Sequence, residues 1–193
     1  MKNKLLLFVF IAAVCYACTD SPSSSVTFND RFIVIDGHDL RTPDGEKFFI
    51  RGTNLGNWLN PEGYMFLFRD VSSYRLINQA FCEMVGPDFT AGFWNEFKKN
   101  YITEKDIEYI KKTGMNSIRL PFHYKLFTDE DYMGMTESQN GFEIVDTLLN
   151  RCRKHNLYVI FDMHDAPGGQ TGDNIDDSYG YPWLLENEND KQL

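Results

Sequence analysis

The segment Tyr158–Gln170 constrains the fold of this 193-residue chain more than any other part of the sequence. In it, a short apolar run ends in Asp162 and His164, and a loop rich in Gly and Pro follows at once. Buried parallel strands have this pattern when they carry polar side chains to a site at their carboxyl ends. Because side chains alternate between the two faces of a strand, Asp162 and His164 are expected to point the same way.

The rest of the chain predicts an α/β fold with parallel strands. Apolar runs at residues 116–120 and 157–161 predict two strands, and a stretch with helical spacing lies between them. Thr103 and Asp106 form a variant capping box, and Gly114 is a natural end for the helix that the box begins. In all, the sequence predicts helices at residues 73–84, 89–100, 103–113 and 141–155. Strands that alternate with helices are typical of βαβ units.

The start of the folded region predicts a short β-hairpin. Asp-Gly turns separate apolar runs, of which the last, residues 48–51, is expected to lead into a first parallel strand and its loop at Arg51–Trp58. Residues 60–101 are rich in aromatic side chains and long for a simple connection. This segment predicts either a lid or wall over a site, or plain packing around the first helix.

Composition excludes some classes of partner. The formal net charge is −9, and no basic stripe occurs, which argues against nucleic-acid binding. Aromatic residues make up 15% of the chain. An acidic chain with many aromatic residues is compatible with a neutral substrate such as a sugar.

The N-terminus predicts an export signal. Lys2 and Lys4 precede the apolar run Leu5–Val14, which is too short to span a bilayer, since a helix needs about 20 residues for that. Cys18 follows Ala17 and precedes a Ser-rich stretch, as in bacterial lipoproteins. We therefore expect an exported protein, anchored to the membrane at the bacterial cell surface or in the periplasm; plain secretion is the alternative.

This interpretation divides the chain into a lipoprotein signal peptide at residues 1–18, a Ser-rich tether at residues 19–28 and a folded region at residues 29–193. Only Cys82 and Cys152 lie in the folded region. The spacing of these two residues predicts no metal site. Two buried thiols are favoured over a disulfide, because the sequence alone does not bring the two residues within reach of each other.

Several polar residues follow the predicted strands. Arg119, at the end of one strand, is a candidate to hold and orient a neighbouring carboxylate, although the residues alone favour a structural ion pair at the rim. His123 and Tyr124 are candidates for hydrogen bonds to a hydroxylated ligand or for packing. His164 is a candidate site residue because of its place at a strand end, whereas a lone His is more often structural.

Two groups of residues invite further hypotheses. The acidic residues around His164 suggest a metal site, but their spacing does not match a calcium loop, so a solvated acidic loop and no metal are expected. These residues are Asp162, Asp165, Asp173, Asp176 and Asp177. Aromatic residues in or near predicted loops suggest a carbohydrate ligand, because sugar rings stack on aromatic faces. They are Trp58, Tyr64, Phe66, Tyr179, Tyr181 and Trp183.

Three segments in order resemble glycoside hydrolase family 5, the cellulase-like family, and the third also resembles its exo-β-1,3-glucanase branch. They are Arg51–Leu59, Asn116–Phe122 and Val159–Gly172. The resemblance implies a (β/α)₈ TIM barrel, here its N-terminal part of about three of eight βα units preceded by the hairpin. It also implies retaining hydrolysis of O-glycosidic bonds in β-glucan-type polysaccharides, with no cofactor.

By the same resemblance, Arg119 matches the family's second-strand Arg beside the nucleophile, and His164 matches the third-strand His at the site of the cleaved sugar. Asn54, Trp58 and His123 lie in matching segments and are candidates for substrate binding.

The sequence departs from the family in one respect. The family's two catalytic Glu residues, an acid/base and a nucleophile, have no counterpart in this chain and are expected downstream. The chain alone is therefore predicted to be inactive. A non-catalytic glycan-binding surface lipoprotein is the main alternative, and a metal-dependent hydrolase that uses His164 and the acidic cluster is another.

Overall fold

A computed structural model describes residues 32–173, 176–178 and 180–186. The signal, the tether, Cys18 and Tyr179 therefore lie outside the described residues. The chain divides into two compact units, with the boundary between Phe49 and Ile50. None of the helices within the described ranges is long and apolar enough to cross a membrane.

The first unit contains a β-hairpin. Strands β1 (Val34–Asp36) and β2 (Asp39–Arg41) pair antiparallel across a tight turn at Gly37, whose φ of 62° lies in the left-handed region that glycine favours. The Arg41 guanidinium lies 2.5 Å from the Asp36 carboxylate and closes the hairpin.

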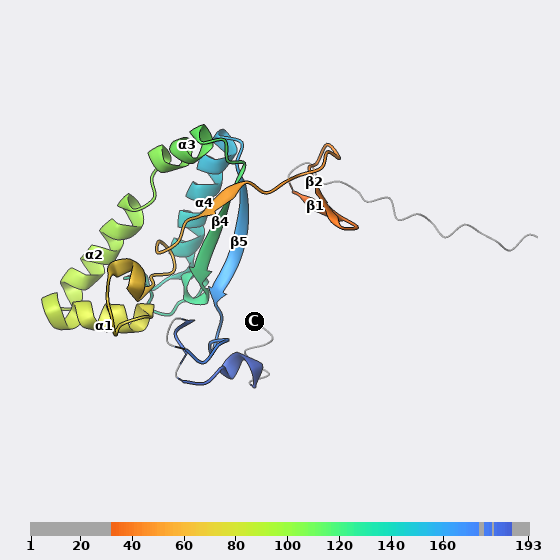
Figure 1. Cartoon of the computed structure of the whole chain (residues 1–193). Coiled ribbons are helices and arrows are strands. Elements are labelled where there is room, and N and C mark those ends of the chain that lie inside the picture. Colours follow the sequence, from red (N-terminus) through yellow and green to blue (C-terminus); the bar gives the residue numbers. More distant parts are fainter. Residues whose placement is uncertain (1–31, 174–175, 179, 187–193) are drawn as a thin grey trace, which may run out of the picture. The chain divides into compact units, whose positions relative to one another are not determined.

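The second unit is built on a three-stranded parallel sheet in the order β3-β4-β5 (Figure 1). Its strands are β3 (Gly52–Asn54), β4 (Ser117–His123) and β5 (Tyr158–Asp165). The helices are α1 (Tyr74–Val85), α2 (Pro87–Asn100), α3 (Glu104–Lys112) and α4 (Ser138–Lys154). Short 3-10 turns are η1 (Gly63–Phe66), η2 (Tyr124–Phe127) and η4 (Trp183–Leu185). The four predicted helices and the strands at residues 116–120 and 157–161 are confirmed within a few residues.

The apolar run at residues 48–51 is not a strand, contrary to expectation. Phe48 N–H donates to the Leu40 carbonyl of the hairpin at 2.7 Å, whereas the Arg51 carbonyl accepts from Asn116 N–H of the sheet unit at 2.8 Å. The run therefore changes partners within four residues and cannot follow one ladder. Phe49 is largely exposed for the same reason.

The core lies between the sheet and its helices. Ile118 and Leu120 of β4 are fully buried beside Ile107 of α3 and Leu148 of α4. Alternation along β4 leaves the intervening Arg119 on the other face of the sheet. The capping box at the start of α3 is confirmed, since Thr103 N–H donates to the Asp106 carboxylate at 2.7 Å.

The aromatic segment between β3 and α3 packs on itself. Rings from η1, α1 and α2 meet edge to face or tilted around Trp94, which is fully buried. Such pairs contribute beyond their buried area. For residues 66–97, the structure favours packing over a lid. The two described cysteines, Cys82 and Cys152, are free thiols; Cys152 is buried, as predicted, whereas Cys82 is only partly buried.

Gly141 gives a direct test of the packing of helix α4 on the turn η2. A Cβ on Gly141 of α4 would overlap the Leu126 carbonyl oxygen, whereas a Cβ on Gly92 of α2 would meet nothing within 4 Å. We expect Gly141→Ala to lower the free energy of unfolding by about 1–3 kcal/mol. The control Gly92→Ala should raise it by about 0.5–1 kcal/mol, because alanine favours helix. Equal midpoints in denaturant titrations of the two variants would contradict the packing of α4 on η2.

Candidate functional site

The pairing of the strands brings three predicted residues to one face of the sheet. Asn54 lies opposite Arg119, and Arg119 lies opposite Ile160. Paired residues share a face, and residues two and four positions beyond Ile160 share it too. Asp162 and His164 therefore join Arg119 on the face that carries no helix among the described residues, as expected for the strand ends (Figure 1).

Arg119 is the centre of this site. Its Nη2 donates to Oδ2 of Asp162 and lies 3.1 Å from Nδ1 of His164. The same Nδ1 lies 2.9 Å from Oδ2 of Asp162. Since an ionised carboxylate only accepts, this shorter contact favours a proton on Nδ1, which leaves Nε2 as an acceptor. All three side chains are about one-third exposed, so the Arg119–Asp162–His164 group is accessible from solvent.

This group has defined chemical abilities. The strand β4 continues four residues beyond Arg119, which therefore lies within the strand and not at its end. Its guanidinium can bind and orient carboxylates, and it favours their ionised form. The imidazole beside it offers a hydrogen bond to a hydroxyl group. The arrangement thus suits a hydroxylated ligand and an additional carboxylate next to Arg119.

The loop after β5 is braced against the site. Gln170 donates from Nε2 to the His164 carbonyl and accepts at Oε1 from Ala166 N–H at 3.1 Å. Oδ2 of Asp176 accepts from the backbone N–H of Gln170 at 2.9 Å and of Thr171 at 2.5 Å. Side-chain and backbone bonds to this loop, together with the Ser178 hydroxyl, lower the pKa of Asp176 against the opposing effect of burial.

Exposed aromatic rings lie on the same loop. Tyr181 and Trp183 are 43% and 51% exposed, and their ring centroids are 5.1 Å apart. Leu184 N–H donates to the Gly169 carbonyl and ties this pair to the loop after β5. Of the aromatic residues predicted to meet a sugar, these two and Tyr64 are exposed, whereas Phe66 packs against Phe97.

Two predicted ligand-binding residues are buried instead. Trp58 is only 2% exposed, and its indole N–H donates to the Lys98 carbonyl at 2.9 Å, so it offers no open face to a sugar ring. His123 is 1% exposed and lies among carboxyl groups below the surface. Neither side chain presents an open surface to solvent in this structure. Asn54 is exposed at the end of β3.

The sequence predicted that the acidic cluster is a solvated loop, but in the structure only Asp173 of its five residues is exposed. Asp165 and Asp176 are almost completely buried, and Asp162 is held by Arg119. Among the described residues, no group of three or more His, Cys, Asp or Glu side chains is arranged to hold a metal ion. Burial, with the nearby Asp177 charge, raises the pKa of Asp165 to about 8.

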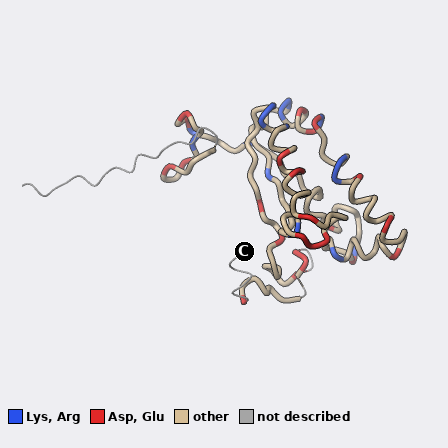
Figure 2. The backbone as a smooth tube through the Cα atoms, turned by 180° about the vertical axis from the view of Figure 1, so that it is seen from behind, with Lys and Arg blue, Asp and Glu red and all other residues tan. Residues whose placement is uncertain are grey.

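Charge is distributed unevenly over the second unit. Figure 2 shows acidic residues gathered in the loops at the carboxyl ends of the strands, while most lysines and arginines lie on helices. Arg119 is therefore a cation in acidic surroundings, which suits a ligand without strong negative charge.

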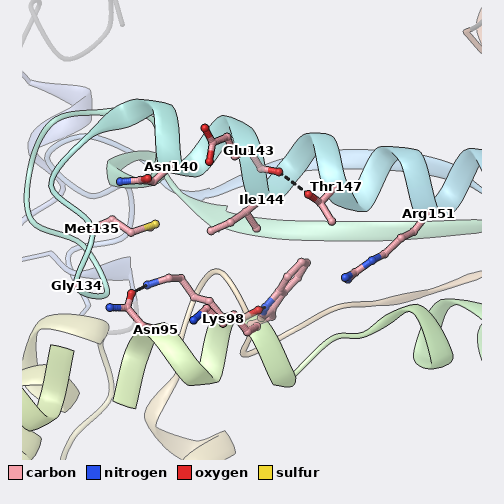
Figure 3. Close-up of a pocket in the computed structure, with 11 residues that line it drawn as sticks. Asn95, Lys98, Gly134, Met135, Asn140, Glu143, Ile144, Thr147 and Arg151 are labelled. Carbon is pink, nitrogen blue, oxygen red and sulfur yellow. Dashed lines mark hydrogen bonds between the residues drawn. The ribbon is translucent and has the colours of Figure 1, made fainter. Parts of the chain in front are cut away.

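A separate cavity of about 630 Å³ lies between α2 and α4 (Figure 3). Asn95 and Lys98 of α2 line one side, and Glu143, Thr147 and Arg151 of α4 line the other. Lys98 donates to Asn95 Oδ1 at 3.1 Å and to the Met133 carbonyl, and burial lowers its pKa to about 8. The cavity lacks Arg119 and His164, so it is distinct from the candidate site.

Sequence reasoning did not predict the supporting role of several buried residues near the site. Asp165 and Asp177 lie near His123, Asn60 donates to Asp165, and Gln170 braces the loop after β5. The available signal was the position of Asp165 directly after His164 at a strand end. It was insufficient because strand alternation alone does not reveal which strand-end residues become buried.

Comparison with protein families gives one match. The family model "Cellulase (glycosyl hydrolase family 5)" matches residues 80–186, which is more than half of the chain. The match includes β4 and β5 and so the Arg119–Asp162–His164 group.

Curated relatives carry names of glycosidases. A β-xylosidase of Phanerodontia chrysosporium is 32% identical over 74% of this chain and 29% of its own length. Endoglucanase C of Acetivibrio thermocellus is 41% identical over 62% of this chain and 26% of its own length. A probable glucan 1,3-β-glucosidase A of Emericella nidulans is 33% identical over 64% and 30%, respectively. The chain thus spans less than one-third of the length of these relatives.

Among solved structures, the rutinosidase from Aspergillus niger is similar in fold. Its TM-score is 0.59 at 21% identity, over 75% of this chain and 41% of that chain. At this identity the likeness concerns the fold alone.

Proposed function

Because the chain belongs to glycosyl hydrolase family 5, the cellulase family, we propose that the intact protein hydrolyses O-glycosidic bonds in β-glucan-type polysaccharides. The names of the relatives, endoglucanase and glucan 1,3-β-glucosidase, support a β-linked glucan as the substrate. In this proposal the three strands are the first part of a (β/α)₈ barrel, in which sites lie at the carboxyl ends of the strands.

The observation that carries the proposal is the Arg119–Asp162–His164 group. It lies on the face opposite the helices, with Arg119 level with the last residue of β3 and His164 near the end of β5, and it is partly accessible to solvent. Exposed rings at Tyr181 and Trp183 supply apolar faces of the kind on which sugars stack. The acidic surroundings favour a neutral ligand.

The proposed reaction is a double displacement with retention. One carboxylic acid protonates the leaving oxygen while a second carboxylate attacks the anomeric carbon, and water then opens the glycosyl-enzyme. Both carboxyls would come from strands beyond the three described here. Arg119 would keep the attacking carboxylate ionised and in place, as it holds Asp162, and His164 would bind a hydroxyl of the cleaved sugar.

Replacing Arg119 tests this role. In the intact protein, we expect Arg119→Ala to lower kcat by roughly 10²–10³-fold with a smaller change in KM, because a preorganised cation acts mostly in the transition state. Reducing-sugar release from laminarin and carboxymethyl cellulose measures the rate. Arg153→Ala, an exposed change on α4, is the matched control. A wild-type rate for Arg119→Ala on the best substrate would show that the assigned role is wrong.

The isolated 193-residue chain should not cleave glucan, because the two carboxyls are assigned to other strands. Affinity electrophoresis in laminarin separates this outcome from a purely binding protein. Retardation of both the chain and the intact protein, without sugar release by either, would favour the non-catalytic glycan-binding alternative. Sugar release by the chain alone would refute the assignment of the carboxyls.

For the location, we propose export and anchoring through a lipid on Cys18. The apolar run, Ala17 and the Ser-rich stretch of the sequence support this. In a bacterial host, labelled palmitate should enter the protein, and Cys18→Ala should abolish the label while Cys15→Ala retains it. Secretion of an unlabelled wild-type protein would favour the alternative of a soluble exported enzyme.

A further inference from the structure

A cluster of buried polar side chains lies directly beneath the candidate site. Asn60 follows β3, His123 ends β4, Asp165 ends β5, and Asp177 belongs to the segment that returns after the loop. The first three are about 1% exposed, and the side chain of Asp177 is 8% exposed. The cluster, here called the strand-end cluster, thus joins all three strands of the sheet to the loop that carries Gln170.

The contacts of the strand-end cluster are specific. Asn60 Nδ2 donates to Oδ1 of Asp165 at 3.2 Å. His123 Nε2 lies 3.5 Å from Oδ2 of Asp177 and 3.8 Å from Oδ2 of Asp165. Lys125 N–H donates to His123 Nδ1, so the proton of the neutral ring is on Nε2 and faces both carboxyls. These carboxyl contacts are longer than normal hydrogen bonds and act electrostatically.

The register of β4 and β5 connects this cluster to His164. Phe122 pairs with Met163, but the next residue, His123, pairs with Asp165. β5 therefore carries one extra residue at this point, His164, as in a β-bulge. Bulges of this kind direct a side chain and are common beside active sites. The pairing of His123 with Asp165 resumes the register directly after this extra residue, so the two side chains mark the far end of the bulge.

The loop after β5 also holds His164 in place. Gln170 bonds the His164 carbonyl, and Asp176 binds the loop backbone at Gln170 and Thr171. The next residue, Asp177, enters the cluster, where Arg75 Nε lies 3.4 Å from its Oδ1. His164 is thus held through its backbone by the loop and through its neighbour by the cluster.

From this geometry we propose that the strand-end cluster is a positioning site, in which Asp165 fixes the bulge at His164 and the loop after β5 in the arrangement that binds the sugar. The cluster touches no substrate itself. The binding part of the proposal depends on the proposed function, whereas the fixing of the bulge and loop does not.

Charge makes the cluster sensitive to pH. Burial raises the pKa of Asp165 to about 8, with the nearby acidic residues adding to the rise, so that Asp165 is protonated at neutral pH. Burial lowers the pKa of His123, which stays neutral. Burial would raise the pKa of Asp177, but the nearby His123 and Ser73 side chains and the Arg75 charge outweigh it and lower that pKa. The ionisable groups around Asp165 are Glu62, His123, Tyr132, Asp176 and Asp177.

The sign of the pH dependence follows from linkage. When the loop opens, Asp165 returns toward its usual pKa of 3.8 and releases its proton. The closed state therefore loses stability as pH rises toward 8, by up to about tenfold in the opening equilibrium per pH unit, and changes no further above that pH. An amide at this position cannot ionise and should remove the dependence.

The test uses hydrogen exchange of the intact protein between pH 5 and 9, normalised to intrinsic rates. We expect protection of the Ala166 and Gln170 amides to fall with rising pH and to level off above pH 8 in the wild type. Asp165→Ala should lower that protection about tenfold or more at pH 6, the effect of losing a buried bond. Asp165→Asn should restore protection relative to Asp165→Ala and show no pH dependence. Asp146→Ala, an exposed change on α4, is the control.

Kinetics give the second readout. Asp165→Ala should raise KM for a glucan oligosaccharide more than it lowers kcat, and Asp165→Asn should reverse part of that rise. If Asp165→Ala does not fold, Asn60→Ala, which removes only the amide donor, is measured in the same way. Wild-type loop protection in the folded alanine variant, or an asparagine variant that behaves like alanine, would overturn the proposal. If the intact protein cleaves no glucan, the proposed function fails, while the exchange data still decide whether Asp165 fixes the loop.

Discussion

The parallel pairing of β4 with β5 is the constraint on which the site depends. It sets Arg119 opposite Ile160, and alternation then brings Asp162 and His164 to the same face. One guanidinium can therefore contact a carboxylate and an imidazole that lie more than forty residues away in sequence. The helices cover the other face, where Ile118 and Leu120 are buried. The core residues and the site residue therefore alternate along the same strand.

Asp176 and Asp165 show how different surroundings give two similar carboxyl groups different roles. Asp176 is buried but receives backbone N–H bonds, which compensate the charge. Asp165 is equally buried, receives one amide bond and faces Asp177, so its neutral form is favoured. The first organises the loop as an anion, and the second joins the strand ends as an acid. The number of hydrogen-bond donors that reach each buried carboxyl group is therefore the physical difference between them.

Much of this arrangement could be predicted from local sequence. Helical spacing and the capping box at Thr103 located the helices, because these signals act within one or two turns. Alternation placed Asp162 and His164 together, and the strand end suggested Arg119. These predictions depend only on the periodicity of a strand or helix, which an amino-acid sequence displays directly.

Other features required three-dimensional information. The run at residues 48–51 has a strand-like composition but divides its hydrogen bonds between two units. Trp58 and His123 lie after or at the end of a strand, as ligand-binding residues do, yet both are buried. Trp58 bonds the Lys98 carbonyl of α2, and the Tyr132 ring and two carboxyl groups lie against His123. Burial and register depend on contacts between distant segments, so neither residue type nor spacing reveals them.

The most direct test of this account is a crystal structure of the intact protein with a bound β-glucan oligosaccharide. The account predicts a sugar ring whose hydroxyl lies within hydrogen-bond distance of His164, with Arg119 beside a carboxylate from a later strand. An oligosaccharide bound only in the cavity between α2 and α4, with Arg119 and His164 remote from it, would contradict the account.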